Sequence, residues 1–161
     1  MKLEILMILC VFLLGFLSCY VVNFFNEDYE VPVLKKIGFG NFELEAPSNF
    51  INEESIEILE DRVIIYLDDA SLSRYAPSGS MIPVFDEGAN GIRVKIKSID
   101  EISVGDIITF KEDNILIVHR VIEKGTDSKG IYFITKGDNN NVDDGKIRFE
   151  DIKYKTIGVI W

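Results

Sequence analysis

The residues best suited to do chemistry together are Ser80, His119 and Asp144, and His119 is the only histidine of the chain. A serine hydroxyl is a poor nucleophile at neutral pH, so it needs a neighbouring base to remove its proton. A histidine serves as that base more effectively when a carboxylate fixes its tautomer and stabilises its cation. The three residue types therefore predict acyl-transfer chemistry with Ser80 as nucleophile, His119 as base and Asp144 as the acid that orients the base.

Each of these residues also lies in a segment that has an ordinary structural interpretation. Pro77-Ser78-Gly79-Ser80 is typical of a turn, since proline presets the backbone and glycine allows positive φ. Strand alternation places His119 on one face with Ile117 and Val121, as for a core histidine. Gly137-Asp138-Asn139-Asn140 is typical of a hairpin turn. These alternatives stay open for each segment taken alone.

The acidic stretch from Asn140 onward has some features of a calcium loop. Such a loop needs alternating oxygen ligands before a glycine, and an acid near its twelfth position. Asp144, Gly145 and Asp151 fit this spacing, but Val142 stands where a ligand is needed. The calcium pattern is therefore incomplete. The sequence has no histidine or cysteine cluster for zinc and no glycine-rich nucleotide loop, so it predicts no metal and no cofactor.

In order and local sequence, three segments of the chain resemble the type I signal peptidases. The resemblance is to the archaeal and endoplasmic-reticulum branch, which uses histidine where most bacterial members use lysine. The segments are residues 77–83, 118–120 and 136–144, and Gly105-Asp106-Ile107-Ile108 also recurs in such proteins. The match to these motifs covers roughly residues 77 to 145.

The resemblance assigns a role to each candidate residue. Ser80 falls on the nucleophile, His119 on the base and Asp144 on the acid that orients it. The Ser78 hydroxyl, with the backbone N–H of Ser80, falls on the oxyanion hole, and Asp138 falls on a supporting acid. The implied activity is that of a serine endopeptidase acting on an extended polypeptide such as a signal peptide. Small residues are implied just before the scissile bond.

The first apolar run, Ile5 to Phe25, predicts a single transmembrane helix. At about 1.5 Å per residue it spans roughly 30 Å, the thickness of a bilayer core. A cleaved signal sequence is the alternative, but the run is longer than a signal core of about 7 to 15 residues. Cys10 and Cys19 both lie inside this run, so neither predicts a disulfide of the folded domain.

Flanking charges leave the orientation of the helix open. The short N-terminal tail and the resemblance favour a cytoplasmic N-terminus in the cell membrane and an extracytoplasmic catalytic domain. We therefore expect contact with membrane lipid. The net charge of −10 argues against a nucleic-acid partner, because phosphate binding needs clustered lysine and arginine.

The predicted organisation has three parts and is mainly β, a signal-peptidase-like β domain on a single N-terminal transmembrane helix. Residues 1–25 form the cytoplasmic tail and anchor, residues 26–76 a linker and β-hairpin segment of uncertain role, and residues 77–161 the peptidase-like β domain. Apolar arms around Glu60-Asp61-Arg62 predict the hairpin. Further strands are predicted from alternation and turn residues at 92–96, 107–110, 115–122, 131–135 and 156–161.

Two other functions remain compatible with the sequence. A non-catalytic, membrane-anchored β binding module would keep the scaffold without an activated serine. A peptidase with a Ser/Lys dyad would use Lys136 or another lysine in place of His119.

The chain also departs from the signal peptidases that it resembles, in which the nucleophile follows the membrane helix after a short link. Here the 54 residues from Asn26 to Gly79 separate the apolar run from Ser80.

Overall fold

The computed structural model describes residues 44–161. The predicted anchor Ile5–Phe25 and both cysteines lie outside this described part, as does the first part of the predicted linker. Within residues 44–161, no helix is long and apolar enough to cross a membrane.

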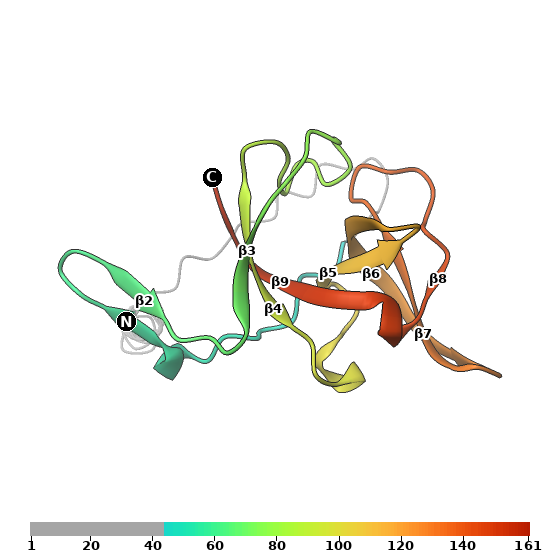
Figure 1. Ribbon diagram of the computed structural model, residues 1–161, viewed down its shortest axis with the longest axis horizontal. Coiled ribbons are helices and arrows are strands. Elements are labelled where there is room, and N and C mark those ends of the chain that lie inside the picture. Colours follow the sequence, from blue (N-terminus) through green and yellow to red (C-terminus); the bar gives the residue numbers. More distant parts are fainter. Residues whose placement is uncertain (1–43) are drawn as a thin grey trace, which may run out of the picture. The chain divides into compact units, whose positions relative to one another are not determined.

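The described residues are mainly β, as predicted, and every paired strand is antiparallel. One sheet has two strands in the order β1-β2, and the other has seven in the order β3-β4-β9-β5-β6-β7-β8 (Figure 1). One short 3₁₀ helix precedes the first strand and two lie between strands. The strands are β1 (Ile56–Ile58), β2 (Val63–Ile65), β3 (Ala70–Arg74), β4 (Asn90–Lys95), β5 (Ile107–Glu112), β6 (Ile115–Asp127), β7 (Gly130–Lys136), β8 (Lys146–Ile147) and β9 (Ile152–Ile160), and the 3₁₀ helices are η1 (Glu53–Ser55), η2 (Ile99–Glu101) and η3 (Phe149–Asp151).

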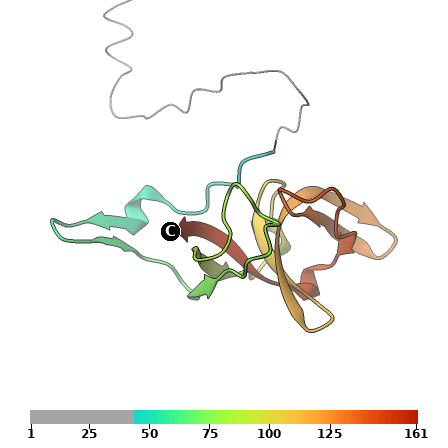
Figure 2. The same cartoon turned by 90° about the horizontal axis from the view of Figure 1, so that it is seen from above.

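The predicted hairpin corresponds to β1 and β2, which are joined by the charged turn expected from the sequence. The five further predicted strands correspond to β4, β5, β6, β7 and β9 with shifted ends. Strands β3 and β8 were not predicted. Seen from above (Figure 2), β9 runs between the β1–β2 hairpin on one side and β6 and β7 on the other.

Strand β5 lies between two hydrophobic cores, because its alternating side chains point to opposite faces. Ile108 and Phe110 pack in the first core, while Ile107 packs in the second. The first four residues of β5 are buried, so this strand has no exposed side chain before Lys111. The first core comprises Ile102, Ile108, Phe110, Val121, Phe133, Ile147 and Ile152, and the second Tyr75, Met81, Phe85, Ala89 and Ile107.

The only histidine of the chain lies on the long strand β6, which pairs with β5. Its register pairs His119 with Ile108, and Val121 on the same face of β6 belongs to the first core. Beyond that point the pairing with β7 shifts between Val121 and Glu123. A β-bulge of this kind re-aims the residues beside it. The sheet thus holds His119 at the border of the first core, where the ring lies 6.5 Å from that of Phe110.

Residues 44–50, which precede the first strand, are tied to the seven-stranded sheet by a buried charge cluster. The Lys155 ammonium lies 2.8 Å from the Asp106 carboxylate and donates to the Ser48 hydroxyl at 2.7 Å. Ser48 in turn donates from its backbone N–H and its hydroxyl to Asp106, each at 2.8 Å. Because every member is bonded, the cluster can stay buried without an uncompensated charge.

Truncating Phe133 to alanine is expected to lower the free energy of unfolding by about 3 to 5 kcal/mol, because it leaves a cavity in the first core. The Phe133 side chain is 0% exposed. Val142→Ala is the matched control, since Val142 is 75% exposed and its truncation should change stability by less than about 0.5 kcal/mol. Denaturant unfolding of both variants checks the difference, and equal midpoints would contradict this core.

Candidate active site

The loop that carries Ser80 follows β3 and is held by the second core. Tyr75 and Phe85, at its two ends, stack with ring centroids 4.0 Å apart. Gly79 has φ +68°, a backbone conformation that residues other than glycine rarely adopt. Its N–H donates to the Asp86 carboxylate at 2.9 Å. Burial raises the pKa of the Tyr75 hydroxyl. The loop thus presents Ser80 from a fixed turn.

Ser78 and Ser80 lie against each other within this turn. Their hydroxyl oxygens are 3.1 Å apart, and the backbone N–H of Ser80 donates to the Ser78 hydroxyl oxygen at 3.3 Å. These are the two groups that the sequence assigns to an oxyanion hole. In this structure the Ser78 hydroxyl oxygen therefore accepts a hydrogen bond from the Ser80 N–H.

His119 and Asp144 are brought together from β6 and from the loop after β7. The Nδ1 of His119 lies 2.7 Å from Oδ2 of Asp144, and the His119 side chain is only 9% exposed. Thr135 donates its hydroxyl to the same carboxylate oxygen at 2.7 Å, and its carbonyl accepts the Asp144 N–H at 2.9 Å. Asp144 is thus fixed at both its backbone and its side chain, and it fixes the imidazole in turn.

A hollow of about 410 Å³ joins the serine turn to the histidine strand. Ser78, Ser80 and His119 all line it, and no lysine does. Lys136 instead lines a neighbouring, smaller hollow with Asp138. The remaining lining is largely apolar and comprises Tyr75, Ala76, Met81, Phe85, Asp86, Ile115, Leu116, Ile117, Val118 and Asn140.

Asp138 does not line the hollow of Ser80. Its fully buried carboxylate accepts two hydrogen bonds from the Arg120 guanidinium, at 2.8 Å from Nε and 2.7 Å from a terminal nitrogen. The other terminal nitrogen of Arg120 donates to the carbonyls of Gly105 at 2.8 Å and Glu45 at 3.1 Å. Arg120 follows His119 directly, so this ion pair holds the part of β6 that carries His119.

The loop from Gly137 to Gly145 also contacts the serine turn. Asn139 donates from its backbone N–H to the Ser80 carbonyl at 2.9 Å and from its side chain to the Gly79 carbonyl at 3.1 Å. Asn139, Thr135 and Arg120 were not assigned roles from the sequence. Asn139 lies within the segment that gave the family resemblance, but nothing in the local pattern distinguishes Thr135 from other strand threonines.

Gly137→Ala is expected to lower turnover about 10- to 100-fold and the free energy of unfolding by about 1 to 3 kcal/mol. A methyl group there would lie 2.7 Å from the Ser80 carbonyl oxygen, so the serine turn must shift, and shifts of about 1 Å cost up to about 10² in rate. Gly158→Ala is the control, because its nearest atom would be Ile92 Cδ1 at 3.6 Å. Cleavage rates and melting curves test the pair; full activity of Gly137→Ala would show that the loops do not constrain each other.

Asp138→Asn is expected to lower the free energy of unfolding by about 3 kcal/mol. The change leaves the Arg120 guanidinium buried without its counter-ion, which is strongly destabilising. Asp61→Asn breaks the exposed ion pair with Arg62 and should have no measurable effect. Denaturant unfolding measures both, and a wild-type midpoint for Asp138→Asn would mean that Arg120 is solvated.

The calcium-like stretch is part of the same loop. Within residues 44–161, no three histidine, cysteine, aspartate or glutamate side chains are grouped so as to hold a metal ion. Asp144 bonds to His119 and Thr135, and the Asp143 carboxylate accepts the Gly145 N–H at 2.9 Å. The Asp143 and Asp144 carboxylates are thus turned toward protein donors.

Comparison with known proteins finds relatives over part of the chain, and no family model matches it. It is 34% identical over 83 residues to "Signal peptidase I W" of Bacillus subtilis (strain 168), which is 50% of this chain and 44% of that protein. It is 46% identical over 70 residues to "Signal peptidase complex catalytic subunit SEC11C" of Homo sapiens, covering 42% of this chain and 36% of that protein.

A fungal protein gives a similar match. "Signal peptidase complex catalytic subunit SEC11" of Metarhizium acridum is 44% identical over 70 residues, covering 42% of this chain and 40% of that protein. The chain thus spans less than half the length of these curated relatives. Their names confirm the resemblance inferred from the three segments: over about half of its length, the chain is related to the type I signal peptidases.

Proposed function

We propose that the protein is a membrane-anchored serine endopeptidase of the signal-peptidase type, cleaving exported or membrane-tethered polypeptides. The observation that carries the proposal is the 2.7 Å contact of His119 with Asp144 beside the hollow that His119 shares with Ser80. The relatives named as signal peptidases support the same activity. A non-catalytic binding module would need no such ordered imidazole, and a lysine base would need a lysine in that hollow.

The proposed reaction follows from the groups that line the hollow. Asp144 binds Nδ1 of His119, so Nε2 is the nitrogen that accepts the Ser80 proton while the Ser80 oxygen attacks a peptide carbonyl. The developing oxyanion accepts hydrogen bonds from the Ser80 N–H and the Ser78 hydroxyl, replacing the contact between those two groups. His119 then protonates the leaving amine, and water hydrolyses the acyl-enzyme.

The surroundings of Ser80 suit an extended polypeptide with apolar character. Residues 115–118 at the start of β6 line the hollow, and Ile115 and Leu116 are exposed there. A substrate strand can lie beside this segment and present its carbonyl to Ser80, as in β-augmentation. By similarity to the signal peptidases, we propose small residues just before the scissile bond.

The membrane part of the proposal rests on the sequence. The apolar run Ile5 to Phe25 would act as a single-pass anchor in the cell membrane, with the N-terminus in the cytoplasm and residues 44–161 outside it. A substrate polypeptide tethered in the same membrane by its signal peptide would then reach the site from the bilayer surface. Asp138 would act as a supporting acid through Arg120 rather than by touching the substrate.

The test is cleavage of a signal-peptide-bearing protein by the full-length chain reconstituted in lipid vesicles. N-terminal sequencing of the product identifies the cut bond, and Ser80→Ala serves as the inactive control. Lys136→Met should retain activity if His119 is the base, whereas a Ser/Lys dyad predicts its loss. Absence of cleavage across several signal peptides would favour the binding module.

A further inference from the structure

A second hollow lies away from the proposed active site, where the β1–β2 hairpin adjoins β3, β4 and β9. It measures about 860 Å³ and no charged side chain lines it. We call it the hairpin groove. Its lining residues are Ile51, Val63, Ile65, Leu67, Ala70, Ser71, Leu72, Ile92, Ile157, Gly158, Val159 and Ile160.

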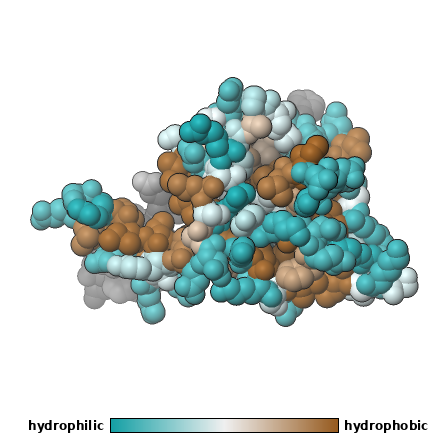
Figure 3. Space-filling model, in the orientation of Figure 1, coloured by the Kyte–Doolittle hydropathy of each residue, from teal (hydrophilic) through white to brown (hydrophobic). Residues whose placement is uncertain are grey.

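Large apolar side chains stand open to solvent around the hairpin groove. Leu72 is 68% exposed and Val63 is 61% exposed, and Ile58 on the neighbouring strand is exposed as well. Figure 3 shows apolar atoms gathered over the hairpin, with hydrophilic atoms at its tip. A two-stranded sheet is at best marginally stable in water, and contiguous apolar patches mark interaction sites. The groove therefore has the properties of a surface that a partner covers.

The edge of β3 offers hydrogen bonds to the same partner. Among the described strands β3 pairs only with β4, so the outer edge of its backbone is unpaired. Residues 70–72 of this edge strand also line the hairpin groove. An added strand could thus use the backbone of β3 for affinity and the groove for its alternate side chains, which is the arrangement of β-augmentation.

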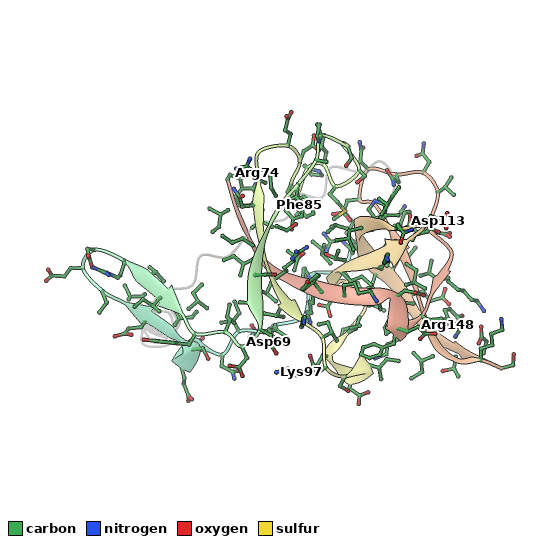
Figure 4. All side chains as sticks on the ribbon, in the orientation of Figure 1. Asp69, Arg74, Phe85, Lys97, Asp113 and Arg148 are labelled. Carbon is green, nitrogen blue, oxygen red and sulfur yellow. The ribbon has the colours of Figure 1, made fainter. Side chains whose placement is uncertain are left out.

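The charges beside the hairpin groove indicate the chemistry of the partner. Residues 52–69 include seven acidic side chains and one basic side chain, Arg62, whereas β3 itself ends at Arg74 and its Ser71 hydroxyl accepts from Arg93 at 3.1 Å. Arg62 pairs with Asp61, and Asp69 pairs at 3.0 Å with Lys97, which lies in the connection after β4 (Figure 4). The excess negative charge favours a cationic partner and disfavours the anionic surface of many membranes.

We propose that the hairpin groove binds an extended segment of a partner protein, in which apolar side chains alternate with lysine or arginine. The segment pairs with the free edge of β3, buries its apolar side chains in the groove and places its cations near the acidic hairpin. Asp68 is suited to meet one of these cations, because it is exposed and lies between the groove residues Leu67 and Ala70. The proposal does not depend on the peptidase activity.

Calorimetric titration of the full-length protein in phosphatidylcholine nanodiscs tests the proposal. The probe is a short peptide in which leucine alternates with lysine and threonine, and the matched probe has glutamate in place of lysine. The lysine peptide should bind at least about 10-fold more tightly. Leu72→Glu should weaken its binding by about 10-fold or more, and Glu60→Lys with Asp68→Lys by about 5-fold.

Val142→Glu, which alters a valine that is 75% exposed and lies outside the groove, should bind like the wild type, as should Ser80→Ala. Equal binding of both peptides, or wild-type affinity in Leu72→Glu, would overturn the proposal.

Two further outcomes would also overturn it, because they would assign the hairpin groove to a different occupant. Quenching of the only tryptophan, Trp161 beside Ile160, by brominated lipids would assign the groove to the bilayer. Disulfide-linked dimers of Leu72→Cys would assign it to a second copy.

Discussion

Replacing Ser80 or His119 by alanine is expected to lower turnover by about 10⁶-fold while leaving the fold intact. Removing either the nucleophile or the base of a serine-protease triad abolishes the same step, which is why single losses are so large. Both side chains lie at the edge of a hollow, so their truncation removes little from either core. Single-turnover cleavage and thermal melting of each variant provide the measurement.

The double variant supplies the sharper comparison. Because the two residues act as a unit, Ser80→Ala with His119→Ala should be hardly slower than either single variant. Ser128→Ala, in the exposed turn between β6 and β7, should cleave at the wild-type rate. Substantial turnover by either single variant would remove that residue from the catalytic assignment.

Asp144→Asn is expected to cost about 10⁴ in rate, the scale seen when the orienting acid of a triad becomes an amide. His119 and Thr135 contact the same carboxylate oxygen of Asp144, and the neutral amide that replaces it no longer carries the charge that stabilises the imidazolium. Where the amide NH₂ takes the position of that oxygen, it faces Nδ1 and favours the tautomer with its proton on Nε2. Nε2 then cannot accept the Ser80 proton.

Turnover and melting temperature of Asp144→Asn and Asp138→Asn separate the two acids. We expect Asp144→Asn to be folded and slow, whereas Asp138→Asn should lose stability together with activity. A folded, inactive Asp138→Asn beside an active Asp144→Asn would mean that the two roles are reversed.

Alternation and turn chemistry were sufficient to find most strands of this fold. The arms of the hairpin and the strand of His119 are rich in β-branched residues and bounded by polar turns, so their local preference agrees with their final pairing. Strand β3 reads Ala-Ser-Leu-Ser-Arg, which has no β-branched residue, and β8 has only two residues. Both form because neighbouring strands pair with them, which local sequence does not encode.

The candidate site shows the same division. The types of Ser80, His119 and Asp144 and their family-like order predict these three residues as a candidate site. The pairing of Arg120 with Asp138 joins residues 18 apart, and Ser48 reaches Asp106 across 58 residues. Contacts over such separations depend on the register of the sheet, so no spacing rule reveals them. The segment from residue 44 to 50 could therefore not be given a role from sequence.

Arg120 joins three stretches of chain that are distant in sequence: the segment of Glu45, the turn of Gly105 and the loop of Asp138. Releasing the Asp138 loop leaves the buried guanidinium without its counter-ion, and releasing either carbonyl leaves one of its N–H groups without an acceptor. Opening any of the three stretches therefore costs free energy at the others, so we expect them to open together as one foldon. Contacts made more than 70 residues earlier in the chain thus help to hold the loop that carries Asp144 and, through it, the imidazole.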